Sequence, residues 1–449
     1  MTTMLFQLAL VVAALAALCG LQSKAAGASP SAGWERFYIG TYTWNSSKGI
    51  YWSGLDLGTG TLSPTNLAGT VTSPSFVALH PNRKLLYAVN EDGGKVIAFS
   101  VNPSTGALTL LNQQDSNGAS PCHVVVDRGG RDVLVANYTG GSVMVFPIHA
   151  DGRLGAATSH IQHAGTSPHA HCVALDGNNR FALVCDLGLD KIMCYRFDSE
   201  LGTLTANTTP WTSVAAESGP RHLTFDPQYR RAYVICEKSA TIIGFNYDST
   251  NGTLTAFQTI STLPTGYSGQ KSAAEIAFHP SGAFLYGSNR GCNSIAVFNV
   301  DPQTGALTQV QQQTTGQTPR SFAIDPSGAF CLVADQDSDD IRLYTVNSQT
   351  GFLSATVQKL TVSKPVCVLP FITQPSQPVL NAQPTATNTL SIDIGNSLSV
   401  LTYELYQAPA LEPGITWNLL ASGIQGQTNF VVTNSAPQGF IRANVATNY

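Results

Sequence analysis

The chain has 449 residues, of which 11% are charged, and its formal net charge is −4. With 40 glycines and no cluster of basic residues, this composition is typical of a β-rich protein with many turns and disfavours nucleic-acid binding. The length allows one large β domain with a smaller domain beside it.

Residues 1–28 are predicted to be a secretory signal peptide. The apolar stretch from Leu8 to Leu18 is too short to span a bilayer, and Ala26-Gly27-Ala28 fits a cleavage site made of small residues. No later stretch is long and apolar enough for a membrane span. We therefore expect a periplasmic or secreted protein without an integral membrane segment, and a cytoplasmic location is the alternative.

Two sequence markers recur along residues 34–372 at intervals of about 50 residues. The first marker is a short strand, a turn with Asp or His that usually contains Pro, and an apolar strand; its copies begin at Ser75, Cys122, His171, Arg221, Ala274 and Arg320, and Val366 begins a further candidate first strand. The second marker is a Gly-x-Leu turn, which begins at Gly60, Gly106, Gly152, Gly202, Gly252, Gly305 and Gly351. Repeats of this length with four strands each predict an all-β fold, a seven-bladed β-propeller.

The repeat begins in the middle of a blade. Phe37–Tyr42 matches a second strand and Gly49–Trp52 a third, so the missing first strand has to come from Pro365–Val368 near the other end of the propeller. Such a closure joins the two ends of the ring. Residues 373–386, rich in Pro, Gln and Thr, are expected to form a linker, and residues 387–449 a small β-sandwich domain with an attachment or scaffolding role.

One end of the propeller channel is expected to carry the functional site. First strands line the channel, so the starts of first strands and the ends of second strands share one face. That face gathers arginines, imidazoles and carboxylates, whereas the opposite face carries turn residues such as His80, Asp226 and His279. The candidate site residues are Glu237, His169, His171 and Arg221 for catalysis, and Arg290, Glu275, His123 and Arg320 for substrate binding.

The hairpin Ser218–Glu237 carries the strongest chemical signal. The start of its first strand lies beside the end of its second, so Arg221 and Glu237 should be neighbours. Arginine binds carboxylate or phosphate and can stabilise an oxyanion, while Glu or His can take a proton from water. An ion-pair network that only ties blades together is the alternative. The pair His169 and His171 lacks an evident third metal ligand, so no metal or cofactor is expected.

Several motifs resemble the lactonase family of seven-bladed propellers. They are Phe37–Thr43, Ala136–Tyr138, Ser167–His171, Asp186–Gly188, Gly219–His222 with Glu237, Ala274–Ile276 and Ser288–Gly291. That family contains propeller-type 6-phosphogluconolactonases and fungal carboxymuconate-lactonizing enzymes. The resemblance implies a channel-mouth site of one His, two Arg and one Glu, at His169 or His171, Arg221, Glu237 and Arg290.

The resemblance further implies hydrolysis of 6-phospho-D-glucono-1,5-lactone or a related aldonolactone by metal-independent attack of water. Arg221 and Arg290 are expected to bind the anionic group and the developing oxyanion, and Glu237 with His169 or His171 to activate water. We expect a monomer whose partner is the small-molecule lactone. A muconate-type lactonizing isomerase and an exported propeller that only binds a ligand or a protein are the alternatives.

Overall fold

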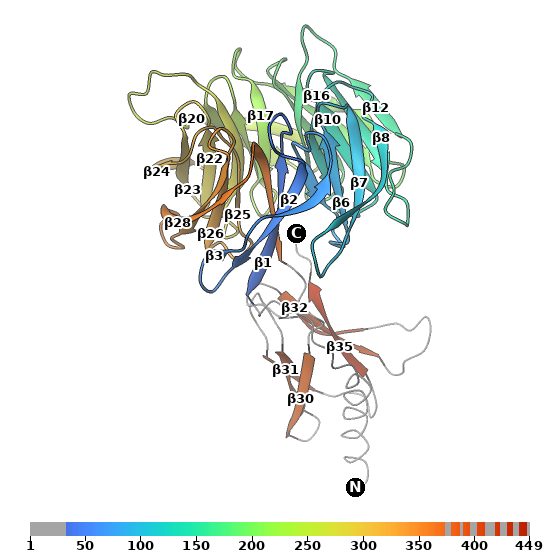
Figure 1. Ribbon diagram of the computed structural model, residues 1–449. Coiled ribbons are helices and arrows are strands. Elements are labelled where there is room, and N and C mark those ends of the chain that lie inside the picture. The colour runs from blue at the N-terminus through green and yellow to red at the C-terminus, as the bar shows by residue number, and fades with distance from the viewer. Residues whose placement is uncertain are drawn as a thin grey trace.

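The computed structural model describes residues 33–372 in full and six further strands between residues 379 and 446. Residues 33–372 form seven antiparallel sheets around a central channel (Figure 1). The described residues include no helix that is long and apolar enough to cross a membrane. The predicted signal peptide, residues 1–28, lies outside the described residues.

The strands follow the predicted repeat. The first blade contains β29 (Pro365–Ile372), β1 (Trp34–Thr41), β2 (Gly49–Asp56), β3 (Thr61–Leu62) and β4 (Asn66–Thr70). The second contains β5 (Val77–Leu79), β6 (Leu85–Asn90), β7 (Lys95–Val101) and β8 (Leu108–Asp115), and the third β9 (Pro121–Val126), β10 (Asp132–Asn137), β11 (Ser142–Pro147) and β12 (Ser159–Gln162). The fourth contains β13 (Ala170–Leu175), β14 (Phe181–Asp186), β15 (Lys191–Asp198) and β16 (Thr203–Ser213), and the fifth β17 (Pro220–Phe225), β18 (Arg231–Cys236), β19 (Thr241–Asp248) and β20 (Thr253–Ser261). The sixth contains β21 (Ala273–Phe278), β22 (Phe284–Asn289), β23 (Ser294–Val300) and β24 (Leu307–Thr314), and the seventh β25 (Pro319–Ile324), β26 (Phe330–Asp335), β27 (Asp340–Val346) and β28 (Leu353–Thr361).

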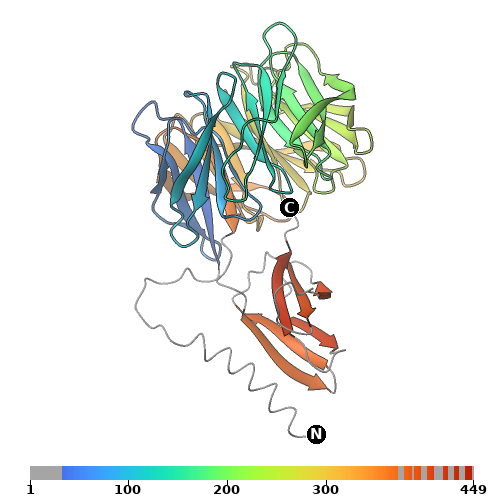
Figure 2. The same ribbon diagram turned by 90° about the vertical axis from the view of Figure 1, so that its right-hand side faces the viewer.

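The ring closes through the first blade, as the sequence predicts. Strand β29 pairs antiparallel with β1, and Tyr38 lies opposite Leu369 while Gly40 lies opposite Cys367. The two views show these strands, orange and blue, side by side at the point where the ends of the propeller meet (Figures 1 and 2). The pairing removes the open sheet edge that a linear array of blades would leave.

Each Gly-x-Leu turn leads from the third to the fourth strand of a blade and packs against the preceding blade. All seven glycines have a positive φ, between 62° and 86°, which a residue with a side chain adopts only at a cost. Four of their carbonyls accept a hydrogen bond from a buried tyrosine of the preceding blade; the pairs are Tyr38–Gly106 at 2.9 Å, Tyr87–Gly152 at 3.0 Å, Tyr233–Gly305 at 2.7 Å and Tyr286–Gly351 at 2.8 Å. The marker therefore recurs because each such turn packs against another blade.

The face opposite the predicted site is structural. His80 Nε2 lies 2.9 Å from the Gly130 carbonyl oxygen, and His279 Nε2 lies 2.9 Å from that of Gly328, so both imidazoles link adjacent blades. The Asp226 carboxylate accepts hydrogen bonds from the backbone N–H groups of its own turn. These contacts confirm the turn roles predicted for this face.

The C-terminal strands form two three-stranded sheets. One contains β31 (Thr389–Gly395) between β30 (Val379–Ala386) and β34 (Asn429–Thr433), and the other β32 (Thr402–Ala408) between β33 (Asn418–Ser422) and β35 (Phe440–Ala446). Residues 379–386, predicted to be linker, are thus strand β30, and residues 373–378 lie outside the described residues. The sandwich domain and its boundaries remain predictions.

Glu35 on β1 gives a stability prediction. Its side chain is 1% exposed, and neither carboxylate oxygen has a hydrogen-bond partner within residues 33–372. Burial and the negative charge of Asp325 raise its pKa well above the usual 4.5, although Arg83 lowers it in part. We expect Glu35→Met to increase the free energy of unfolding at neutral pH by about 1–3 kcal/mol, because an unpaired buried polar group is removed.

The pH dependence follows from the direction of this shift. Above about pH 4.5 the unfolded chain loses the Glu35 proton while the folded chain keeps it, so rising pH lowers the stability of the native protein until the folded pKa is reached. Urea unfolding of the native protein, Glu35→Met and Glu35→Gln between about pH 4 and pH 8 measures this contribution. Equal pH slopes for all three proteins would contradict it.

Candidate active site

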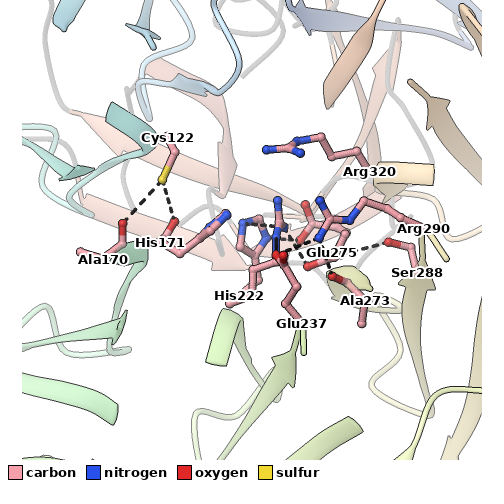
Figure 3. Close-up of polar contacts among 12 residues, drawn as sticks. Cys122, Ala170, His171, His222, Glu237, Ala273, Glu275, Ser288, Arg290 and Arg320 are labelled. Atoms are coloured by element: carbon pink, nitrogen blue, oxygen red, sulfur yellow. Dashed lines mark hydrogen bonds and ion pairs between the residues drawn. The ribbon is translucent and has the colours of Figure 1, made fainter. Parts of the chain in front are cut away.

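A small pocket lies at the channel end where first strands begin and second strands end. Its volume is about 10 Å³, which is about the room that one water molecule needs. It is lined by Ser75, Phe76, Glu91, Cys122, His171, Arg221, His222, Glu275, Arg320 and Val366. The lining thus combines two carboxylates, two imidazoles and two guanidinium groups at the predicted end of the channel. Figure 3 shows several of these side chains, among them His171, His222, Glu275 and Arg320.

Glu237 connects two arginines beside this pocket, and one of them, Arg221, lines it. Its Oε2 lies 3.1 Å from Nε of Arg221 and 2.8 Å from Nη2 of Arg290. Arg221 lies near the start of β17 and Glu237 directly follows β18, so the contact predicted from the hairpin is present. Arg290 directly follows β22 and reaches Glu237 from the next blade. The Arg221 side chain is 3% exposed and that of Glu237 is 26% exposed, so the carboxylate can meet a ligand from the solvent.

The charge state of Glu237 follows from its partners. Burial alone would raise its pKa, but the positive charges of Arg221, Arg290 and Arg320 outweigh burial and hold the pKa below 4.5. The group is therefore an ionised carboxylate at neutral pH. Burial and the neighbouring Arg221 lower the pKa of Arg290 to about 10, so that side chain remains a cation.

A histidine and a second carboxylate form the wall of the pocket. His222 Nδ1 lies 2.7 Å from Oε1 of Glu275, and its Nε2 lies 3.2 Å from Nη1 of Arg221. Burial lowers the pKa of His222, which outweighs the attraction of Glu275. We assign a neutral imidazole that donates to Glu275 and accepts from Arg221, so His222 fixes the orientation of the guanidinium.

The structure separates the two histidines of the Ser167–His171 loop. His171 lines the pocket, and its Nδ1 is buried without a hydrogen-bond partner in the described part of the chain. Burial and the positive charge of Arg221 hold its pKa well below 6.5. The His169 ring instead lies on Tyr138, with Nδ1 3.0 Å from the Tyr138 carbonyl oxygen and Nε2 3.1 Å from Oγ of Ser167. His171 is therefore the histidine that can meet a ligand in the pocket, whereas His169 stabilises the loop.

Asp186 anchors the Ser167–His171 loop. Its Oδ1 accepts a hydrogen bond of 2.9 Å from the backbone N–H of His169, and its Oδ2 lies 2.6 Å from Nδ1 of His163. Both side chains of the Asp186–His163 pair are fully buried. Backbone and imidazole donors outweigh the effect of burial and lower the pKa of Asp186, so an ionised group fixes the loop that carries His171.

A third group of contacts contains Tyr42 and Glu91, which were not among the site residues predicted from the sequence. Tyr42 OH lies 3.1 Å from each carboxylate oxygen of Glu91 and accepts a hydrogen bond of 3.0 Å from Nη2 of Arg320. Arg320, predicted to bind substrate, therefore reaches the pocket from the seventh blade (Figure 3) and bonds Tyr42 of the first blade. Tyr42 and Glu91 both end second strands, and that position was the signal that could have identified them.

The remaining predicted residue, His123, lies behind the pocket. Its ring packs 4.2 Å from Phe76 and 5.4 Å from His222, centroid to centroid, and it does not line the pocket. Burial, with the positive charge of Arg221, holds its pKa well below 6.5. The imidazoles of this region pack edge to face, and within the described ranges no three His, Cys, Asp or Glu side chains are arranged to hold a metal ion.

The arrangement defines a class of protein, a seven-bladed propeller with arginine, carboxylate and histidine side chains gathered at one end of its channel. Residues 36–370 match the family model described as "Lactonase, 7-bladed beta-propeller". The chain therefore belongs to the Lactonase family, and it is a lactonase of the 6-phosphogluconolactonase-like kind.

Named relatives and solved structures agree with this assignment. The 6-phosphogluconolactonase of Bacillus subtilis is 37% identical over 64% of this chain and 83% of its own length. The periplasmic gluconolactonase of Pseudomonas aeruginosa is 30% identical, with a TM-score of 0.73 over 76% of this chain and 100% of that structure. A protein from Lactobacillus plantarum is 34% identical, with a TM-score of 0.71 over 75% of this chain and 99% of that structure.

These coverages give a prediction about the C-terminal region. The two solved structures match almost completely although a quarter of this chain has no counterpart in them. A protein ending at Ile372 is therefore expected to fold and to keep its turnover number, because the closing strand β29 is complete. Thermal melting and the lactonase rate of the shortened protein test this. Aggregation or loss of turnover would show that residues 373–449 stabilise the propeller.

Proposed function

We propose that the chain hydrolyses the 1,5-lactone of a sugar acid, 6-phospho-D-glucono-1,5-lactone or a related aldonolactone, by metal-independent attack of water. The observation that carries the proposal is the carboxylate of Glu237 held between Arg221 and Arg290, beside a pocket that Arg221 lines and that has room for one water molecule. The names of the relatives, 6-phosphogluconolactonase and gluconolactonase, support the same chemistry.

The two arginines supply the electrostatic part of the reaction. The lactone carbonyl oxygen becomes an oxyanion when water adds to the carbon, and guanidinium groups at that position stabilise the developing charge. Arg290 Nε is buried without a partner among the described residues, so one donor of this group is not used by the protein. Arg320 lies on the other side of the pocket and is placed to bind an anionic or hydroxyl group of the substrate.

Glu237 and His171 handle the proton of the attacking water. Oε2 of Glu237 is occupied by both arginines, which leaves Oε1 to orient and deprotonate water. His171 is a neutral imidazole on the pocket wall and can accept a proton. The C–O bond to the ring oxygen then breaks, the ring oxygen takes a proton, and the product is the open-chain acid. Both groups are weak bases, and a weak base is sufficient because a 1,5-lactone is reactive towards water.

This route needs no covalent nucleophile. Cys122 is the thiol that lines the pocket, and its Sγ lies 3.4 Å from the His171 carbonyl oxygen and 3.6 Å from that of Ala170 (Figure 3). Burial raises the pKa of Cys122, so the group is a neutral thiol at physiological pH. A thiol in this state positions the His171 strand and is a poor nucleophile.

The setting of the reaction is proposed on the same basis. Residues 1–28 would direct the chain to the periplasm or the exterior, which agrees with the periplasmic origin named for the Pseudomonas relative. The partner would be a small-molecule lactone, because the site lies in a channel mouth within a single chain. A monomer would be sufficient, since Arg221, Glu237 and Arg290 all come from one chain.

A panel of substrates tests the proposal. Purified protein is supplied with glucono-1,5-lactone, 6-phosphoglucono-1,5-lactone and a carboxymuconate lactone, and acid release is followed against the spontaneous rate. Hydrolysis of either gluconolactone supports the proposal. If the protein only interconverts carboxymuconate and its lactone, the isomerase function is supported. If no lactone is hydrolysed faster than the spontaneous rate, the alternative of a propeller that only binds a ligand or a protein is supported.

A further inference from the structure

Trp44 is an exposed aromatic side chain at the mouth of the site. It lies in the turn between β1 and β2 and is 59% exposed. The other exposed large apolar side chains of the described region, Leu67, Leu110, Leu201, Trp211, Phe352 and Val357, lie on outer strands or in turns that lead to them. Trp44 is therefore the member of this group that is on the face of the pocket, and its exposure costs free energy that a ligand could recover.

The indole is held in a fixed position. Its ring stacks on Tyr42 with a centroid separation of 3.9 Å and an interplanar angle of 8°, and its Nε1–H donates a hydrogen bond of 3.0 Å to Asp92. Asp92 is itself bonded by the Ser73 hydroxyl. One indole face is thus covered by Tyr42, and the ring is oriented by a carboxylate that is also anchored. A rigid aromatic face loses little conformational entropy when a ligand binds.

The same contacts join Trp44 to the reaction site. Tyr42 stacks on Trp44 on one side and bonds Arg320 and Glu91, both of which line the pocket. The Arg320 guanidinium carbon is 5.3 Å from the Tyr42 ring centroid. One aromatic ring therefore separates the indole from the pocket wall, so a substrate with two sugar rings can reach from the pocket to Trp44.

The groups around the indole favour a neutral polyhydroxy ligand. The negative face of an aromatic ring attracts the polarised C–H groups on the flat face of a pyranose, and carboxylates accept hydrogen bonds from hydroxyls. Glu91 and Asp92 carry negative charge beside the indole and would repel a phosphate ester there. The pocket, at about 10 Å³, cannot enclose a sugar ring, so the rings of the substrate have to lie over the mouth.

We propose that Trp44 is a sugar-binding platform and that the substrate is an aldonolactone with a glycosyl substituent, the 1,5-lactone of an oxidised disaccharide. This proposal rests on the lactonase function proposed above and specifies its substrate class. The lactone ring would lie at Arg221 and Arg290, and the second, neutral sugar ring would stack on Trp44.

Comparison of kcat/KM for cellobiono-1,5-lactone, maltobiono-1,5-lactone and glucono-1,5-lactone tests the proposal. The native protein should prefer at least one disaccharide lactone by about tenfold or more, and Trp44→Ala should reduce this preference by about tenfold, mainly through KM. Trp44→Phe should retain part of it. Trp211→Ala is the matched control, because Trp211 is 43% exposed on the outer strand β16 and should leave the preference unchanged.

The outcomes separate this proposal from the lactonase proposal. Equal kcat/KM for the three lactones, or an equal loss on all three in Trp44→Ala, would overturn the sugar platform while leaving lactone hydrolysis intact. If no lactone is hydrolysed, calorimetric titration with cellobionate decides. Binding that Trp44→Ala abolishes and Trp211→Ala retains supports the platform without catalysis, and absence of binding overturns it.

Discussion

Replacing Glu237 by Gln is expected to lower kcat by about 10²–10⁴-fold, the usual contribution of a general base, with the fold retained. The amide keeps the size of the side chain but removes the charge that pairs with Arg221 and Arg290 and the ability to accept a proton. Because the pKa of Glu237 is held below 4.5, kcat/KM of the native protein should stay constant with falling pH until it declines below about pH 4.5. Stopped-flow or pH-stat rates on a gluconolactone measure both effects.

The alternative role for Glu237 is structural, because its contact with Arg290 joins the fifth and sixth blades. Under that interpretation Glu237→Gln lowers the melting temperature and leaves turnover per folded molecule unchanged. Glu200→Gln is the control, since Glu200 forms an exposed ion pair with Arg131 away from the pocket and should alter neither quantity. A stability loss without a rate loss would contradict the catalytic assignment.

Replacing Arg221 by Ala is expected to raise the barrier by roughly 2.7–4 kcal/mol, about 10²–10³-fold in kcat, if the guanidinium stabilises the oxyanion. Arg221 bonds Glu237, His222 Nε2 and the Ala274 carbonyl oxygen at the same time. A lysine cannot reproduce this planar set of contacts, so Arg221→Lys should recover only part of the rate. Rates per folded molecule are compared with melting temperatures for both variants.

Arg231, whose side chain is 12% exposed, offers a control for the removal of an arginine that is largely covered by protein. It lies at the opposite end of the fifth blade, where it bonds the Gln303 carbonyl oxygen and pairs with Asp226 at 3.8 Å. Arg231→Ala should lower the melting temperature and leave turnover unchanged. If Arg221→Ala behaves in the same way, Arg221 is a structural residue and the oxyanion assignment is wrong.

The blade count and the ring closure could be predicted because they depend on local patterns. The glycine of the Gly-x-Leu turn has a positive φ and packs against another blade, where an added Cβ would be crowded, so glycine recurs in each repeat. The ring closure could be predicted because the repeat begins with a second strand, so the first blade needs β29 as its first strand. The division of its outer strand into β3 and β4 was not predicted, and Pro64, which has no N–H to donate, lies between them.

The site was predictable only where a contact is local in sequence. Arg221 and Glu237 share one hairpin, so strand pairing places them together. His169 and His171 could not be separated, because the difference depends on the loop that Asp186 and Tyr138 hold. The contact between Arg320 and Tyr42 joins the seventh blade to the first and depends on how the ring closes.

The most direct test of the account is the rate of gluconolactone hydrolysis by the native protein and by the double variant Arg221→Ala/Glu237→Gln, measured side by side on folded protein. The account predicts a rate that rises in proportion to native protein above the spontaneous reaction, and a rate indistinguishable from the spontaneous one for the double variant. Equal rates for the two proteins, whether both fast or both spontaneous, would contradict a lactonase site at the channel mouth.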